Sequence, residues 1–439
     1  MHWYTMRTGL FLLTGMAFAQ TPAISLQDAL ARAKQYGGQI QTANLAALQA
    51  REDRAQARAN TLPSVNALNQ FIYTEGNGTP SGVFVANDGV HVYNEQAVVH
   101  EDLLSLVRHG EIRRAMAAEA IAKAKIEVAA RGLSATVIQD YYAIVVAQRK
   151  LGNSQTSLKE AERFFDVTQK QEKGGEVAHA DVIKAQIDLQ QRQRDVKEAA
   201  LTIEKARIAL GILIFPTFSA DFGVVDDLAE PAELPAIDAA AAASVSPDIK
   251  AATAGVQEAG WEVSVARYQF LPSFGVDFFY GIDANQFAAT GNGDASGRST
   301  LPNYQVTNRQ NLGYSAQVTL TVPVWNWGAT RSKVKQAELK RDQAQLDLSL
   351  AQRTLQSNLA SAYAESRAAL GQLESLRSSV DLAAESLRLT VLRYQAGEAT
   401  ALEVVDAQNT VTLARNANDD GLARVRVALA NLKVLVGSL

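Results

Sequence analysis

The chain has 439 residues, a net charge of −4 and no cysteine, so disulfide bonds are excluded. Hydrophobic residues make up 47% of it but aromatic residues only 7%, which favours packed helices rich in Ala and Leu over a large aromatic core. No block of Lys and Arg stands out, which argues against nucleic acid as a partner.

Residues 1–19 have the three parts of a secretory signal peptide. Arg7 is the positive charge, Gly9–Met16 the short apolar core, and Ala17-Phe18-Ala19 the cleavage site. The apolar core is too short for a transmembrane helix, and no later run of about 18–20 apolar residues follows. We therefore expect an exported protein with no membrane helix and, without cysteine, no lipid anchor.

An internal duplication is the most informative feature of the chain. Residues 112–213 align with residues 334–435 at a constant offset of 222 without a gap, which places Gly175 on Gly397. Such a repeat predicts one architectural unit used twice. The mature chain then divides into a first repeat over 20–214, a linker over 215–245 and a second repeat over 246–439.

The first repeat opens with a predicted helix over about residues 25–60, where apolar residues recur at helical spacing. It ends at Leu62-Pro63, because proline disfavours helix in the residue before it. The pattern then predicts a strand hairpin over about 64–102, a long helix over about 107–172 and a second helix over about 177–213.

The linker and the second repeat follow. Prolines and acidic residues over 215–245 predict a connection that wraps the outside with little regular structure. The second repeat has the order of the first: a helix over 246–270 that ends at Leu271-Pro272, a strand hairpin over about 273–323, a long helix over about 329–394 and a helix over about 400–437.

The strand segments have a two-residue period. Apolar residues alternate strictly with small or polar ones from Leu312 to Val322. A transmembrane β-strand needs about 9–11 residues, with one face to lipid and the other to a polar interior. Half-buried strands of a soluble sheet have the same period. The glycine-rich segments 76–82 and 290–297 favour the membrane alternative as long outer loops, and the thirteen extra residues of the second repeat are placed in the later one.

Two tryptophans, Trp325 and Trp327, follow the last predicted strand. An interfacial belt of aromatic residues flanks the apolar band of membrane barrels at this position. Ordinary core residues are the alternative. We expect the belt.

The long helices have a 3.5-residue repeat. From Leu355 to Tyr394 the small and apolar residues step by four and three in alternation, which is the pattern of a supercoiled helix. A continuous helix over about 329–394 would be about 100 Å long at 1.5 Å per residue. Each long helix is expected to turn at a glycine, Gly175 or Gly397, because glycine suits the left-handed conformation at helix ends.

Four strands cannot close a membrane barrel, since known examples begin at about eight. Open sheet edges are not tolerated in lipid. A membrane barrel must therefore be shared between chains, with eight strands from two copies or twelve from three.

Two motifs carry a resemblance to a known family. Val322–Gly328 follows the last strand, and Arg393–Gly397 leads into Glu403–Gln408. With Leu-Pro before each first strand and the duplicated order of elements, the whole mature chain resembles the outer-membrane efflux protein family, the TolC-like outer-membrane channels.

The resemblance implies a mainly α fold with membrane β. Four strands per chain would join a shared trimeric 12-stranded barrel in outer-membrane lipid, and a long α-helical coiled-coil barrel would extend through the periplasm. It further implies a homotrimer that docks on a periplasmic adaptor (membrane fusion) protein and an inner-membrane RND or ABC-type pump. The implied function is the exit channel of a tripartite efflux or type I secretion system for small molecules, metals or proteins.

The resemblance also places an acidic ring at the periplasmic entrance. Its residues would be Glu403 and Asp406, three apart and so on one helix face. Repeated around a trimer, six carboxylates would favour cations. Ordinary solvated helix charges are the alternative.

A gate link is implied beside the ring. Asp181 and Tyr394 would join through a carboxylate–phenol hydrogen bond that holds the inner helices shut. The arginine usual in the family after the second glycine is absent, because Ala399 stands there. Arg393 is a candidate substitute.

No constellation of residues indicates catalysis, a metal site or a cofactor; for example, the segment from His100 lacks the second histidine of H-E-x-x-H. We expect no enzyme. The competing class is a soluble periplasmic coiled-coil adaptor, which would explain the helical hairpins but not the four alternating segments.

Overall fold

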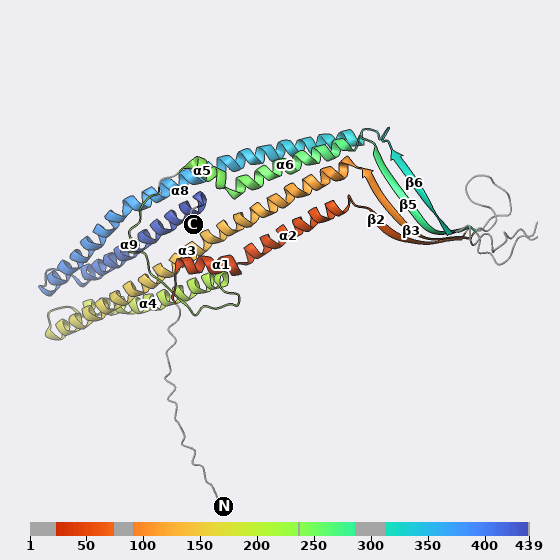
Figure 1. The fold of residues 1–439 in the computed structure, drawn as a ribbon. Helices are drawn as coiled ribbons and strands as arrows, with labels where there is room; N and C mark the ends of the chain where they lie inside the picture. The colour runs from red at the N-terminus through yellow and green to blue at the C-terminus, as the bar shows by residue number, and fades with distance from the viewer. Residues whose placement is uncertain (1–22, 74–90, 236–237, 286–311, 438–439) are drawn as a thin grey trace, which may run out of the picture. The chain divides into compact units, whose positions relative to one another are not determined.

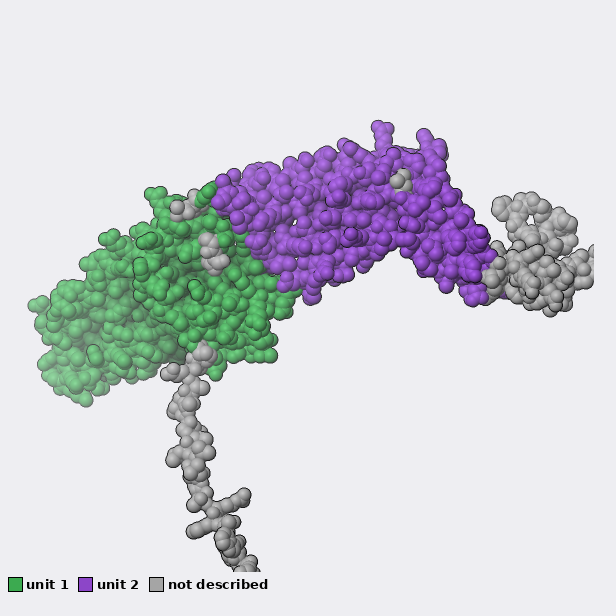
Figure 2. Space-filling view, in the orientation of Figure 1, with its two compact units in different colours: residues 1–41, 130–239, 358–439 green, residues 42–129, 240–357 purple. Residues whose placement is uncertain are grey.

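The chain folds into two compact units (Figure 2). The structure, a computed structural model, describes residues 23–73, 91–235, 238–285 and 312–437. The predicted signal peptide, both glycine-rich segments and the thirteen extra residues lie outside the described residues. Unit 1 comprises Met1–Gln41, Ala130–Ala239 and Asn358–Leu439, and unit 2 comprises Thr42–Ala129 and Ala240–Ser357. Each unit draws on both repeats, so the repeats are not separate compact domains.

Two helical hairpins form most of unit 1. Helix α3 (Leu106–Gly174) turns back as α4 (His179–Ile214), and α8 (Ala329–Gln395) turns back as α9 (Ala401–Val436) (Figure 1). The long helices α3 and α8 have 69 and 67 residues and contribute to both units. No helix in the described part of the chain is both long and apolar enough to cross a membrane.

The core of unit 1 joins the hairpins to the start of the chain. Its fully buried side chains include Tyr141 of α3, Leu210 of α4 and Leu432 of α9. The Tyr141 hydroxyl donates to the Val225 carbonyl at 2.7 Å, and burial raises the pKa of this phenol to about 12. The linker is therefore held against α3 by a satisfied buried polar group.

The first predicted helix is in fact two helices, α1 (Leu26–Tyr36) and α2 (Gly38–Ala59). Gly37 separates them with an extended ψ of 116°. A Cβ at Gly37 would lie 2.3 Å from Leu133 Cδ2 and 2.5 Å from the Ala33 carbonyl oxygen. The single helix expected over 25–60 was wrong at this point, because α1 must leave the helix axis to pack close to α3.

The linker has more regular structure than expected. Strand β1 (Ala23–Ile24) pairs in parallel with β4 (Gly223–Val224), and α5 (Ala239–Val245) precedes the second repeat. Arg149 on α3 clamps the acidic part of the linker: its Nε lies 2.6 Å from Asp226 and its Nη1 3.3 Å from Asp419. Asp226 of the linker is thus ion-paired to α3.

Unit 2 contains a four-stranded antiparallel sheet of order β2-β3-β5-β6. Its strands are β2 (Ser64–Tyr73), β3 (His91–Leu104), β5 (Ser273–Asn285) and β6 (Leu312–Thr321). They lie side by side in Figure 1. Together with the dominant helices they confirm the predicted fold class of a mainly α chain with four strands. Helix α6 (Pro247–Tyr268) packs on α8 in the same unit, where Arg267 pairs with Glu338 at 2.8 Å.

The register gives the sheet a mostly apolar face and a more polar face. One row across the four strands is Val65, Val99, Phe278 and Ala316, and the next is Ser64, His100, Asp277 and Gln317. Successive side chains of a strand point to opposite faces, so the rows belong to different faces. Large apolar residues are left open to solvent on one face, such as Tyr314 at 78%.

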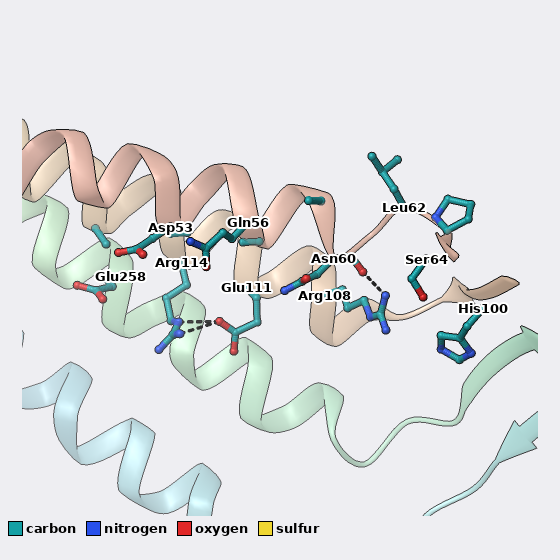
Figure 3. A pocket seen from close by; sticks show the side chains of 15 residues that line it. Asp53, Gln56, Asn60, Leu62, Ser64, His100, Arg108, Glu111, Arg114 and Glu258 are labelled. Carbon is teal, nitrogen blue, oxygen red and sulfur yellow. Dashed lines mark hydrogen bonds and ion pairs between the residues drawn. The ribbon is translucent and has the colours of Figure 1, made fainter. Parts of the chain in front are cut away.

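A polar cavity of about 770 Å³ lies in unit 2 where α2 and α3 meet the strands (Figure 3). Its arginines are paired within the protein: Arg108 with Asp102 and the Asn60 carbonyl, and Arg114 with Glu111 at 2.8 Å. Both arginines of the cavity are therefore already paired with groups of the protein.

Candidate functional site at the helix turns

The two hairpin turns of unit 1 have the same backbone geometry. Gly175 and Gly397 have φ values of 75° and 76°, in the left-handed region. After each glycine the next N–H bonds five residues back, Glu176 to the Gln171 carbonyl at 2.9 Å and Glu398 to the Arg393 carbonyl at 2.8 Å. This is the Schellman helix ending, which requires a residue that adopts positive φ.

A small hydrophobic cluster joins the ends of both hairpins. Tyr394 of α8 packs edge-on against Phe164 of α3, with ring centroids 5.1 Å apart. Ala185 of α4 and Val404 of α9 complete its centre, and both are at most 1% exposed. The turn ends of the two repeats are thus one packed structure within unit 1, so separating them would expose apolar surface.

Tyr394 is the main polar group in this cluster. It is 3% exposed, and its hydroxyl donates to Thr168 Oγ1 at 3.4 Å. Thr168 can accept because its own hydroxyl proton goes to the Phe164 carbonyl at 2.8 Å. Burial raises the pKa of Tyr394, and the negative charge of Asp181 adds to the effect.

The predicted hydrogen bond between Tyr394 and Asp181 is therefore not formed within the chain. Asp181 is half-buried in the first turn of α4 and acts on the phenol through its charge alone. Sequence reasoning missed Thr168, although a threonine at a buried seam position of a helix needs a polar partner. That requirement was the available signal.

Glu403 lies in the first turn of α9 and forms a capping box with Thr400, the residue before the helix. Its backbone N–H donates to Thr400 Oγ1 at 3.3 Å, and its carboxylate accepts from the Thr400 backbone N–H at 3.2 Å. The Thr400 backbone N–H and hydroxyl, followed by the Arg393 charge, hold the pKa of Glu403 below its usual range. In the first repeat, Ala178 at the same position makes no such cap.

Asp406 lies one turn further along α9 and is exposed. At the repeat offset, Glu403 matches Asp181 but Asp406 matches Lys184. Only the second repeat therefore places two carboxylates on this helix face. Because Glu403 is engaged by its cap, Asp406 is the freer of the two charges.

Arg393 spans the Gly397 turn. Its Nη2 donates to the Glu398 carbonyl at 3.1 Å, and its Nη1 lies 3.8 Å from Glu403 Oε2. Ala399 is partly buried against the hydrophobic cluster. Within the single chain, Arg393 therefore braces its own hairpin and does not reach the first repeat.

Trp325 and Trp327 belong to unit 2, between β6 and α8. Their side chains are 75% and 89% exposed, with ring centroids 5.7 Å apart in an edge-to-face pair. Trp327 has a φ of 54°, the only positive value among the described non-glycine residues. In the single chain these tryptophans are surface residues, so the core alternative does not apply to them.

The charged groups of the turn site can attract cations, but they form no cluster suited to a bound metal. No group of three or more candidate metal ligands occurs within the described ranges. The arrangement is an exposed acidic face above a packed hydrophobic junction. The carboxylates of such a face can attract cations electrostatically. The helix ends that carry them can separate only if the hydrophobic junction opens.

Comparisons with known proteins relate part of the chain to one family. Residues 239–438 match the family described as "Outer membrane efflux protein". Outer membrane protein OprJ of Pseudomonas aeruginosa is 26% identical over 186 residues, which span 42% of this chain and 36% of OprJ. The alkaline protease secretion protein AprF of the same organism is 22% identical over 455 residues, covering 98% of this chain and 87% of AprF.

The fold is shared with solved channels. The Campylobacter jejuni CmeC outer membrane channel superposes with a TM-score of 0.79 over 94% of this chain and 85% of CmeC, at 16% identity. The family match covers the second repeat, AprF aligns along nearly the whole chain, and the shared fold includes both repeats. As its motifs predict, the second repeat matches the outer membrane efflux protein family.

Proposed function

We propose that three copies of this chain form an outer-membrane exit channel of a tripartite efflux or type I secretion system. The observation that carries the proposal is the four-stranded sheet of unit 2. It has a mostly apolar face with exposed aromatic side chains, a more polar face, and two edge strands, β2 and β6, without a partner strand among the described residues. Such a sheet is stable in lipid only when its edges are closed.

The strand directions allow closure by copies of the same chain. All neighbouring strands are antiparallel, so β2 and β6 run in opposite directions and β6 of one copy can pair with β2 of the next. Three copies give twelve strands with no free edge. The apolar face would contact outer-membrane lipid, with Trp325 and Trp327 at its interfacial border, and the polar face would line the pore.

The helical hairpins would continue the pore through the periplasm. Helices α3 and α8 are too polar for lipid and are far longer than a bilayer is thick. Their turn ends would meet the periplasmic adaptor and the inner-membrane RND or ABC-type pump. The names of the relatives support an export role, since AprF is a secretion protein and CmeC an outer membrane channel.

The turn site would be the periplasmic entrance. Three copies of Glu403 and Asp406 would place six carboxylates around a narrow opening, and low-dielectric walls would focus their field. Tyr394, with Thr168 and the charge of Asp181, would hold the junction of the two hairpins closed.

Fractionation followed by reconstitution tests this function. The channel proposal predicts recovery in outer membranes as a heat-modifiable oligomer that conducts ions in planar bilayers. Recovery in the soluble periplasmic fraction would instead support a coiled-coil adaptor, and outer-membrane protein without conductance would contradict the exit channel.

A further inference from the structure

A buried charged cluster joins the two returning helices of unit 1. Asp188 and Arg192 of α4 are only 7% and 5% exposed, and Arg192 Nη2 lies 3.2 Å from Asp188 Oδ1. The same guanidinium nitrogen donates to Asn409 Oδ1 on α9. Asp195, which is more exposed, approaches Nη1 at 3.7 Å. One buried guanidinium therefore links α4 to α9.

The duplication does not explain this cluster. At the repeat offset, Thr410 stands for Asp188, Ala414 for Arg192, and Ile187 for Asn409. No member has an equivalent of the same kind in the other repeat. The cluster exists once per chain, at the contact between the repeats.

The cluster is incompletely satisfied. Asp188 Oδ2, Arg192 Nε and the nearby Gln408 Oε1 are buried without a hydrogen-bond partner among the described residues. Burial raises the pKa of Asp188, against the opposing effect of Arg192. The desolvation cost of a buried ion pair can exceed its Coulombic gain, whereas removing one partner leaves an uncompensated buried charge. The contact between α4 and α9 at this point therefore rests on the hydrogen bond from Arg192 to Asn409, with Asp188 compensating the buried charge of Arg192.

We propose that Asp188, Arg192 and Asn409 form a metastable latch that holds α4 against α9 and must break when the turn end of the channel opens. Separation of the helices would hydrate the three unpaired atoms and so recover part of their desolvation cost. Its part in opening rests on the proposed function, but the latch itself does not.

Spin-label distances in the full-length assembled protein test the latch. The chain has no cysteine, so nitroxides can be placed specifically at Lys184→Cys on α4 and Leu402→Cys on α9, both exposed positions. Labelled chains are diluted into unlabelled ones so that double electron–electron resonance reports distances within one chain. In the otherwise unchanged protein we expect one short, narrow distance.

Asp188→Leu is the decisive change, because arginine cannot lose its proton and the buried charge of Arg192 keeps only Asp195, the more distant and more exposed carboxylate. We expect the fraction of chains with separated helices to rise at least about tenfold. Asp188→Leu combined with Arg192→Met replaces the pair by apolar side chains and should restore the single short distance. Glu198→Leu, the removal of an exposed carboxylate on the same helix, should leave the distance unchanged.

Asn409→Ala keeps the test decisive if Asp188→Leu does not fold, and it should shift the distances in the same direction. A distribution unchanged in both single variants, or a double variant as broad as Asp188→Leu, would overturn the latch. These distances need no transport. A protein that shows the latch but does not conduct contradicts the channel function alone, and one that conducts without the latch contradicts the latch alone.

Discussion

At the scale of single residues, the hairpin turns depend on backbone geometry that glycine supplies. Gly397 has a φ of 76°, and no atom lies within 4 Å of where its Cβ would stand. A side chain at this position would therefore be disfavoured by the backbone conformation and not by a steric clash with neighbours. We expect Gly397→Ala to lower the free energy of unfolding by about 1–2 kcal/mol, measured by urea unfolding. Gly371→Ala, in the middle of α8 with equal space but no positive φ, should be neutral or stabilising. Equal losses in the two variants would contradict this account.

The capping box of α9 gives a pH dependence with a defined sign. The folded-state pKa of Glu403 is lowered, so its contribution to stability is present above its unfolded pKa and is lost as the pH falls through the folded value. The protection factors of the amides in the first turn of α9, which compare their exchange with the intrinsic rate at the same pH, should therefore fall on acidification below about pH 4.5. Glu403→Gln keeps a hydrogen-bonding side chain without a charge. If the amide protection of this variant kept the pH dependence of the unchanged protein, the carboxylate of Glu403 would not be the cause of that dependence.

The turn site shows which residues a sequence can and cannot identify. The turn glycines follow from the sequence because helix ends are local, whereas the acidic pair was expected from the family resemblance. The partner of Tyr394 does not, because Thr168 lies 226 positions away on another helix and meets it only through tertiary packing. The latch could not be predicted for the same reason, because Asn409 of the second repeat meets Asp188 and Arg192 of the first repeat only in the folded chain.

At the scale of elements, the linker is held by an arginine hub. Arg149 is one quarter exposed and makes two contacts with Asp226, at 2.6 and 2.9 Å, and one with Asp419 at 3.3 Å. We expect Arg149→Ala to cost about 2 kcal/mol, because hydrogen bonds between charged groups at partly buried sites are lost. Thermal unfolding measures the change.

Arg388→Ala is the matched control for the hub. Arg388 pairs with Glu385 one turn away on the exposed surface of α8. Exposed pairs contribute little to stability, so the loss should stay under about 0.5 kcal/mol. A control loss as large as that of Arg149→Ala would show that the linker contacts carry no special weight.

The long helices and strands could be read from the sequence because their periods, 3.5 and 2, repeat over many residues. The break at Gly37 could not, because it reflects the 2.3 Å approach that a Cβ would make to Leu133 on a distant helix. Strand β4 was missed for a related reason. A two-residue strand has no period, and it forms only where Ala23 and Ile24 lie beside it.

At the scale of the whole molecule, the proposed entrance ring should act mainly through Asp406. Its carboxylate is exposed and has no side-chain partner within the described chain, whereas Glu403 is held by Thr400 and faces Arg393. We expect Asp406→Asn to lower the cation preference in planar bilayers more than Glu403→Gln does.

Asp381→Asn is the control for the ring, since it removes the same charge from an exposed position of α8 away from the turn. It should leave the reversal potential in a salt gradient unchanged. If Asp406→Asn shifted the reversal potential no more than Asp381→Asn, the carboxylates would be ordinary surface charges.

Both the barrel and the entrance ring depend on the number of chains in the assembly. The sheet of one chain has two edge strands without a partner among the described residues, and one turn site supplies one third of the proposed ring. Native mass spectrometry of the protein extracted from outer membranes counts the chains directly. The shared barrel predicts a mass of three mature chains, with twelve strands and no open edge. A stable monomer or dimer in that extract would contradict it.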